Sequence, residues 1–327
     1  MPPVVQLGLP PAVFATFKES LTCLVIGTIL ATGVYGITIL QAYVYFGNSG
    51  RDSIHMKTFV ALLFALETLS LVLMVNILCH YVVSDFGNPF LLLKATPVMA
   101  WENGVTVLIG TLTQSYFAHR LWALSKGNVV LVSSIIILAV CSCGSGMAIS
   151  VNLYTHTDNL FLGSVEIRIL SGLANGLSII CDVLIAASLS YYLHSKKTGF
   201  KRTDSIINRL IIYAVNRGAL TAICQTGHMV TTVALPGRFI FLPFALLDGR
   251  LYCNTLLATL NAQRFIVKED RNNAVELGSD ILNSMNSSTS GNGKQPRTAG
   301  RSVTESSSDS MSGFLPSSGK TKDVAHT

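Results

Sequence analysis

Residues 21–46, LTCLVIGTILATGVYGITILQAYVYF, form an apolar stretch without a single charged side chain. A membrane-spanning α-helix needs about 20 mainly apolar residues, because each adds about 1.5 Å and the hydrocarbon core is about 30 Å thick. A β-barrel, the other fold that can span a bilayer, would show alternating segments of about 10 residues instead. The stretch therefore predicts a membrane-spanning helix.

The same pattern recurs along the chain, in which 50% of the residues are hydrophobic and only 12% are charged. An ordinary soluble domain has about 25% charged residues. Six further windows are long and apolar enough to span a bilayer: Thr58–Val83, Pro97–Leu121, Asn128–Leu153, Ile169–Leu193, Leu210–Leu235 and Phe239–Leu260. The window that contains Glu102 is the weakest, because this acid lies near its outer end. We therefore predict an all-α fold, a seven-transmembrane-helix bundle over residues 21–264.

The distribution of Lys and Arg predicts the orientation of this bundle, because cytosolic loops of membrane proteins are enriched in both residues. With the N-terminus outside, the inner segments carry Arg51, Lys57, Arg120, Lys126, Lys196, Lys197, Lys201, Arg202, Arg209, Arg264, Lys268 and Arg271. The outer segments then carry only Lys18, Lys94, Arg168 and Arg238. We therefore expect residues 1–20 to form an extracytosolic N-terminal segment and the C-terminus to lie in the cytosol. Topology explains the net charge of +6, and no basic face or motif indicates a nucleic-acid partner.

The composition changes after the last predicted helix. Residues 286–313, NSSTSGNGKQPRTAGRSVTESSSDSMSG, are rich in Ser, Gly and Asn and almost free of large apolar side chains. Such a segment buries too little apolar surface to offset the entropy that ordering costs. We therefore predict a disordered, Ser-rich cytosolic tail over residues 265–327.

The inner loop at residues 194–209 is strongly basic. Its cationic side chains are Lys196, Lys197, Lys201, Arg202 and Arg209. Anionic lipid attracts each such residue at a cytosolic interface by about 1 kcal/mol. The lipid bilayer is therefore the expected partner, and a cytosolic protein that docks to this loop or to the tail is compatible with the same charges.

Five charged residues lie near the middle of the predicted spans: Glu67, Asp182, Arg217, Asp248 and Arg250. Ionisable groups near the middle of a bilayer cost several kcal/mol unless they are paired or hydrated, so they face the bundle interior. We expect Arg217 to pair with Asp182 or Asp248, and Arg250 to reach Glu67. Asp248 lies about 200° around the helix from Arg250, so these two should not share a partner.

Polar residues also follow helical spacing on the last three predicted helices, which gives each helix one polar face. The stripes are Ser171, Asn175, Ser178 and Asp182; Arg217, Thr221, Gln225, His228 and Thr232; and Arg250, Asn254 and Asn261. Two interpretations stay open, namely packing by interhelical hydrogen bonds and a ligand cavity or ion path. No two histidines share a helix face at ligand spacing, and all seven cysteines fall within spans, so we predict no metal site and no cofactor.

Several blocks resemble a family of proteins. These are YGITILQAYVYF, DFGNP and QSYFAHRLWALS, and more specifically KTGFKRTDSIINRLI and DGRLYCNTLLATLNAQR. They are similar to a seven-pass membrane protein family of mushroom-forming (basidiomycete) fungi, a domain-of-unknown-function family. The resemblance runs from about Leu21 to Arg264 and is densest in residues 178–264. It implies a multi-pass membrane protein without an established activity, and no catalytic residue is carried over.

Three classes of function remain. A receptor-like protein would have this topology, an outer pocket, a basic third inner loop and a phosphorylatable tail. A transporter or channel would use the charges near the middle of the bilayer, and a structural protein would use them only for packing. An enzyme is not expected, because no zinc-protease motif, nucleophile elbow or phosphate loop occurs. The sequence indicates a multi-pass membrane location and does not decide between plasma membrane and endomembrane.

Overall fold

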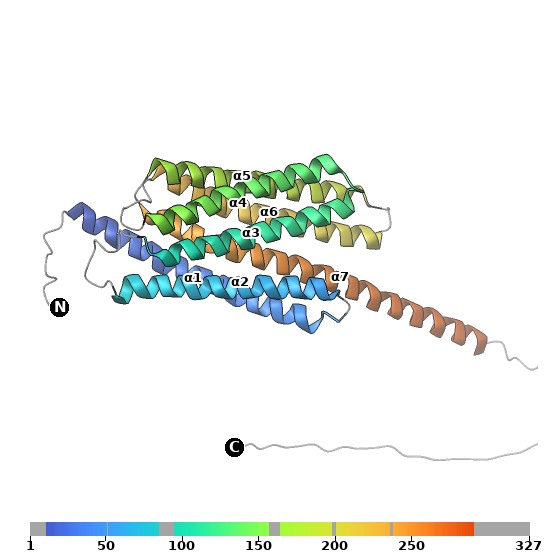
Figure 1. Cartoon of the computed structure of the whole chain (residues 1–327). Helices are drawn as coiled ribbons and strands as arrows, with labels where there is room; N and C mark the ends of the chain where they lie inside the picture. The colour runs from blue at the N-terminus through green and yellow to red at the C-terminus, as the bar shows by residue number, and fades with distance from the viewer. Residues whose placement is uncertain are drawn as a thin grey trace, which may run out of the picture. The chain divides into compact units, whose positions relative to one another are not determined.

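The computed structural model describes residues 11–50, 52–84, 95–156, 164–197, 201–235 and 238–290, with residues 11–17, 201–203, 266–278 and 280–290 described by their backbone alone. Within these ranges the regular structure is entirely helical. The elements are α1 Pro11–Gly47, α2 Ile54–Cys79, a π-helical turn η1 His80–Ser84, α3 Pro97–Leu124, α4 Val129–Thr155, α5 Val165–His194, α6 Lys201–Ala234, a 3₁₀ turn η3 Phe239–Phe241, and α7 Leu242–Ser290. Each of the seven apolar windows is thus helical (Figure 1).

Local sequence signals explain where several helices begin. Ser53, Asn128 and Ser164 precede α2, α4 and α5, and each side chain accepts a hydrogen bond from a backbone N–H in the first turn. Such caps satisfy donors that have no partner within the helix. Pro97 occupies the first turn of α3, where its missing N–H costs nothing. Gly127 follows α3 with φ +84°, a left-handed conformation that suits glycine and turns the chain toward α4.

Five helical segments are long and apolar enough to cross a membrane: Lys18–Gly47, Ile54–Ser84, Val129–Thr155, Val165–His194 and Phe239–Phe265. Large apolar side chains cover their outer faces, as at Leu40 on α1 and Val130 on α4, which are 66% and 80% exposed. A soluble monomer rarely exposes contiguous apolar surface on this scale. The chain is therefore an integral membrane protein. Helices α3 and α6 have comparable lengths but are more polar, and they fall outside this set.

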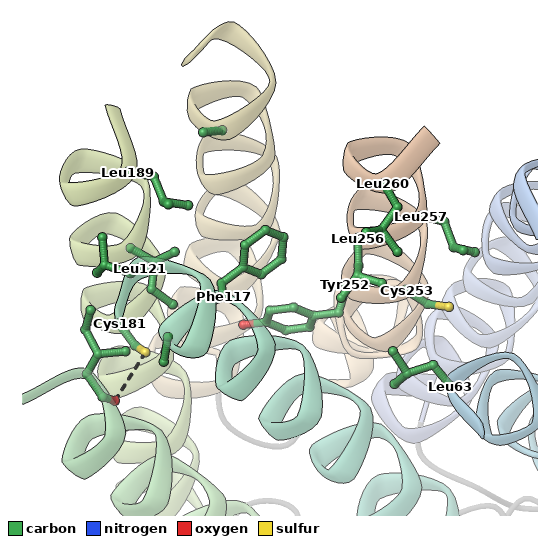
Figure 2. Packing of buried hydrophobic residues seen from close by; sticks show 14 of the residues in the cluster. Leu63, Phe117, Leu121, Cys181, Leu189, Tyr252, Cys253, Leu256, Leu257 and Leu260 are labelled. Carbon is green, nitrogen blue, oxygen red and sulfur yellow. Dashed lines mark hydrogen bonds between the residues drawn. The ribbon is translucent and has the colours of Figure 1, made fainter. Parts of the chain in front are cut away.

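Helix α7 is the most buried of the five segments. Half of its membrane window is buried, against 28% in each of the other four. Its side chains bond to α1, α2, α3, α5 and α6, so it lies in the middle of the helices. The main apolar core includes Leu256, Leu257 and Leu260, in the second half of this membrane window, together with Phe117 and Leu121 of α3. Figure 2 shows Phe117 and Leu257 on opposite sides of α7.

Small residues allow close helix contacts. A Cβ atom at Gly27 of α1 would lie 2.9 Å from the Cα atom of Pro243 in α7, so only glycine fits there. Gly218 of α6 faces Ala186 of α5 in the same way, with 2.7 Å between the added Cβ and the alanine Cβ. Close approach of this kind strengthens packing where lipid provides no hydrophobic drive between helices.

Two predicted boundaries differ from the structure. The segment expected to be disordered from residue 265 is helical up to Ser290, because no proline lies between Pro243 and Pro296 and residues 266–285 are mostly helix-compatible. The expected N-terminal segment 1–20 also contains the first turns of α1 from Pro11. Residues 291–327 of the predicted tail lie outside the described residues. The chain divides into two units, residues 1–272 and 273–327, and all contacts below belong to the first.

Candidate functional site

Helix α7 carries polar side chains on two faces. Arg250 and Tyr252 are two residues apart, so they point about 200° away from each other around the helix. Arg250 contacts α2 and α3, whereas Tyr252 contacts α3, α5 and α6. Figure 2 shows Tyr252 extending toward Phe117 while Cys253 points to the other side, near Leu63. The helix therefore joins two polar clusters.

The first cluster surrounds Arg250, which is fully buried. Its Nη1 atom donates to Ser70 Oγ at 2.9 Å and to Glu102 Oε1 at 3.3 Å, and its Nε lies 3.8 Å from Glu67 Oε1. The hydroxyls of Ser70 and Thr106 also donate to Glu102 Oε1, at 2.9 and 3.1 Å. The predicted pairing of Arg250 with Glu67 is found, and Glu102 joins it. Two carboxylates thus share one guanidinium.

The second cluster centres on Asp182 of α5, which is fully buried. Its Oδ1 accepts from Arg217 Nη2 at 3.4 Å, and its Oδ2 accepts from the hydroxyls of Thr221 and Tyr252 at 2.7 and 2.9 Å. The Arg217 guanidinium lies 3.5 Å above the ring centroid of Phe117. Of the two acids expected to pair with Arg217, the structure places Asp182 there. Hydrogen bonds, an opposite charge and an aromatic face together compensate the burial of this pair.

Tyr252 connects helices through its hydroxyl group. The group donates its proton to Asp182, so toward other neighbours it can only accept. It accepts from Gln225 Nε2 at 2.5 Å and from Gln114 Nε2 at 3.3 Å. One oxygen atom therefore holds α3, α5, α6 and α7 together.

A third contact joins His228 of α6 to Asp248 of α7. His228 Nδ1 lies 2.9 Å from Asp248 Oδ2, and the imidazole stacks on Phe241 with 5.8 Å between centroids. The stack and the carboxylate fix the orientation of the ring. Among the described residues Asp248 and Arg250 have different partners, as their angular separation predicts.

Asn254 and Asn261 extend the Arg250 face of α7 toward α1. Gln41 Nε2 donates to Asn254 Oδ1 at 2.9 Å, and Asn261 Nδ2 donates to the Gln41 carbonyl oxygen at 2.8 Å. Further along, Arg264 pairs with Asp52 and lies over the ring of Tyr45. These contacts attach the C-terminal half of the membrane helix to α1 and its following loop.

A cavity of about 150 Å³ lies between α3, α4, α5, α6 and the start of α7. It is at the end of the bundle where α4 and α6 end and α5 and α7 begin, since Leu153, Ile167, Thr232 and Phe241 line it. Its polar lining comprises Glu102, Asn103, Thr106, Thr111, Gln114, Ser142, Ser171, Asn175, Ser178, Gln225, His228, Thr232, Asp248 and Tyr252. The cavity thus touches all three clusters, and neither arginine lines it.

The buried charges do not balance. Four acids lie in these clusters, namely Glu67, Glu102, Asp182 and Asp248, whereas the sequence predicted three. The two guanidiniums of Arg217 and Arg250 oppose them, and His228 adds a positive charge only when it is protonated. Four carboxyl groups therefore face two guanidiniums in these clusters, and two of the four, Glu102 and Asp248, line the cavity.

The basic loop is described only in part. Lys196 is exposed after the end of α5, and Arg209 is exposed in α6. The backbone of Lys201 and Arg202 forms the first turn of α6, while Lys197 is partly buried. Residues 198–200 lie outside the described residues. The basic side chains thus flank the junction between α5 and α6.

Sequence reasoning missed three residues of the site: Glu102, Gln114 and Tyr252. A signal existed for α3, because Glu102 and Thr106 lie four residues apart on one helix face. For Tyr252 the signal was its spacing of four from Asp248, which places both on one face of α7.

The fold and the site define a class of protein: a helical integral membrane protein with charged residues and a cavity in its interior. Residues 178–265 match the model of a family described as "Family of unknown function (DUF6534)". The segment covers the second half of α5, all of α6 and the membrane part of α7, and so contains Asp182, Arg217, Asp248 and Tyr252. The expected resemblance to a family of unknown function is therefore supported over this segment. Neither a curated protein nor a solved structure matches the chain.

Proposed function

We propose that the protein is a seven-pass membrane protein, N-terminus outside and tail in the cytosol, that acts like a receptor for a small ligand in its cavity. The proposal includes membership of the seven-pass fungal family that the sequence blocks resemble. It also includes a function without catalysis. One observation carries the sensing role. Tyr252 lines the cavity and also donates to Asp182, so a ligand that touches it acts on the contact between α5, α6 and α7.

The outer faces of α3 and α6 support seven spans rather than five. On α6 the polar stripe faces inward, while Ile212, Ile223 and Val230 are between 50% and 71% exposed. A helix with one buried polar face has a low mean hydropathy and still suits a bilayer. The inward polar stripe thus explains why α6 is not among the five segments that are apolar enough by composition to span a membrane.

The two tryptophans of the chain mark the ends of α3. Trp101 and Trp122 are 64% and 43% exposed and lie 21 residues apart, which corresponds to about 32 Å along a helix. Tryptophan is enriched at both membrane interfaces, and the hydrocarbon core between them is about 30 Å thick. The spacing fits a helix that crosses the bilayer.

The location of the cavity supports sensing at the extracytosolic side. In the proposed topology, the ends of α4 and α6 face outside. The opposite half of the interior is filled by Phe117, Leu121, Leu256, Leu257 and Leu260 (Figure 2). This apolar layer separates the cavity from the cytosolic side, where the basic loop 194–209 would contact anionic lipid or a cytosolic protein.

A transporter is the second candidate. The excess of carboxylates favours it, because acidic residues within spans mark cation and proton pathways. The apolar layer argues for the receptor-like function, since conduction would require this layer to open. A purely structural role leaves the cavity unexplained.

Cysteine labelling tests the topology. Pro97→Cys, Lys126→Cys, Ser195→Cys and Arg238→Cys each place a thiol at one end of α3, α5 or α6. An impermeant maleimide should label positions 97 and 238 in intact cells, and positions 126 and 195 only after permeabilisation. If 97 and 126 react from the same side, α3 does not span and the seven-pass proposal fails. The unsubstituted chain, whose cysteines all lie in helices, is the control.

A further inference from the structure

Two buried oxygen atoms on the cavity lining have no hydrogen-bond partner among the described residues. They are Oδ1 of Asp248 and Oε1 of Gln225. Both are acceptors, and no lining residue leaves a buried nitrogen unpartnered in the described part of the chain. A buried acceptor without a donor is unfavourable, and more so when it is charged. The cavity is therefore matched to a ligand that supplies N–H or O–H donors.

The orientation of the Gln225 amide follows from its neighbours. Tyr252 gives its only proton to Asp182, so it needs a donor from Gln225 rather than an acceptor. The Nε2 group of Gln225 therefore faces Tyr252, at 2.5 Å. Its Oε1 atom therefore faces away from Tyr252 and has no partner among the described residues.

The charges around the cavity also favour a cation. Glu102 and Asp248 are the ionisable acids on the lining, and the guanidiniums of Arg217 and Arg250 lie outside it. His228 Nδ1 lies 2.9 Å from Asp248 Oδ2, which leaves Asp248 Oδ1 as the oxygen without a partner among the described residues. Glu102 is already paired with Arg250, so Asp248 is the carboxylate that a positive ligand would meet at the cavity and that would repel an anion.

The rest of the lining is apolar, and the cavity has a small volume. Val107, Ile149, Leu153, Ile167, Phe241 and Ala245 contribute to it. A cavity of about 150 Å³ elsewhere accommodates benzene, so this volume suits a compact body of that size. The aromatic faces of Phe241 and Tyr252 can also attract a cation.

We propose that the cavity binds a small primary ammonium ion with a compact apolar body, held by hydrogen bonds to Asp248 and Gln225. This proposal rests on the receptor-like function above, because it names the ligand class of the same cavity. The ammonium group donates to Asp248 Oδ1 and Gln225 Oε1, and its apolar body contacts the side chains from α4 and α5.

Binding of four matched probes tests the ligand class. They are benzylammonium, benzyl alcohol and benzoate, which are similar in size, and benzyltrimethylammonium, which is larger by three methyl groups. Affinity is measured on the full chain in lipid nanodiscs, by calorimetry and by the shift in unfolding temperature. We expect benzylammonium to bind at least about tenfold more tightly than the other three. The trimethyl probe keeps the charge but has no N–H donor.

Two variants localise the binding. Asp248→Asn should weaken benzylammonium binding about tenfold or more, because it removes the charge next to the cavity. Glu67→Gln is the control, since it neutralises a buried acid that does not line the cavity and should change affinity less than about twofold. If Asp248→Asn does not fold, the comparison of probes on the unsubstituted chain still decides.

The outcomes separate the two proposals. If benzyl alcohol, benzoate or the trimethyl probe binds as tightly as benzylammonium, the primary ammonium assignment is overturned while the cavity remains a ligand site. Equal effects of Asp248→Asn and Glu67→Gln would also overturn it. If no probe of any charge binds, the ligand-binding function fails together with the ligand class.

Discussion

Arg217 and Asp182 form an ion pair in the middle of the bundle, with 3.4 Å between Nη2 and Oδ1 and almost no exposure of either side chain. The pair joins α5 to α6 and lies beside Phe117 of α3. Removal of one partner leaves an uncompensated charge, whereas removal of both leaves neutral groups that can be accommodated. Variants that remove one or both partners can therefore distinguish a role of this pair in packing from a role in sensing.

Asp182→Asn and Arg217→Gln should each destabilise the bundle by roughly 3–5 kcal/mol. The double variant should recover a large part of this loss, because no unpaired charge remains. Reversible unfolding in mixed micelles measures the coupling energy through a double-mutant cycle. Strictly additive losses would show that the two side chains do not stabilise each other.

Arg250 differs from Arg217 because its guanidinium pairs with two carboxylates. Arg250→Met should destabilise strongly, by roughly 3–5 kcal/mol, since it leaves Glu67 and Glu102 close together without a cation. Glu67→Gln should cost less than about 1.5 kcal/mol, because Glu102 still pairs with the arginine. The same unfolding assay compares them. A larger loss for Glu67→Gln would mean that Glu67 is the main partner of Arg250.

The contact between α1 and α7 predicts opposite effects of one substitution at two glycines. Gly27→Ala should destabilise by about 1–3 kcal/mol, because the new methyl group would overlap the backbone of Pro243. Gly33→Ala is the matched control in the same helix, where, apart from the backbone of that helix, no atom lies within 4 Å of the added carbon. It should be neutral or stabilise by up to about 1 kcal/mol. Equal effects at both positions would contradict the close approach of the helices.

Tyr252→Phe removes the hydroxyl that links the cavity to Asp182. We expect a loss of about 1–3 kcal/mol, because the amides of Gln225 and Gln114 lose their shared acceptor. Tyr192→Phe is the control, since its hydroxyl accepts only an exposed bond from Asn128 at 3.2 Å, and it should change stability by less than about 0.5 kcal/mol. If the two variants are equally mild, the hydroxyl of Tyr252 does not connect the helices.

Helical periodicity explains how much of the site the sequence could predict. Apolar length located the seven long helices of the described residues. The direction in which side chains point predicted the pairing of Arg250 with Glu67 and left Asp182 and Asp248 as alternatives for Arg217, which the structure pairs with Asp182. Periodicity does not say which neighbouring helix a side chain meets. Glu102 therefore remained an isolated acid near a helix end, although the long side chain of Arg250 reaches it.

The cavity could not be predicted for a related reason. It depends on how side chains from five helices fill a common space, and a sequence pattern contains no volumes. The continuation of α7 to Ser290 was not predicted, because the polar, Ser-rich composition of residues 265–327 indicated disorder. Residues 266–285 include Val275, Leu277, Ile281 and Leu282 and contain no proline, so a local helix is compatible with a polar average.

The most direct test of the central claim uses the native thiol of Cys143, which lines the cavity. Cys79 and Cys141 are exposed and are first replaced by serine. Two small reagents, the ethylammonium and the ethylsulfonate methanethiosulfonates, are then applied to the extracytosolic side, with a Cys143→Ser chain as the control. The proposed cavity predicts that the cationic reagent modifies Cys143 at least about tenfold faster and that benzylammonium slows it. No modification from outside, or equal rates for both reagents, would contradict a cation-selective cavity that faces outward.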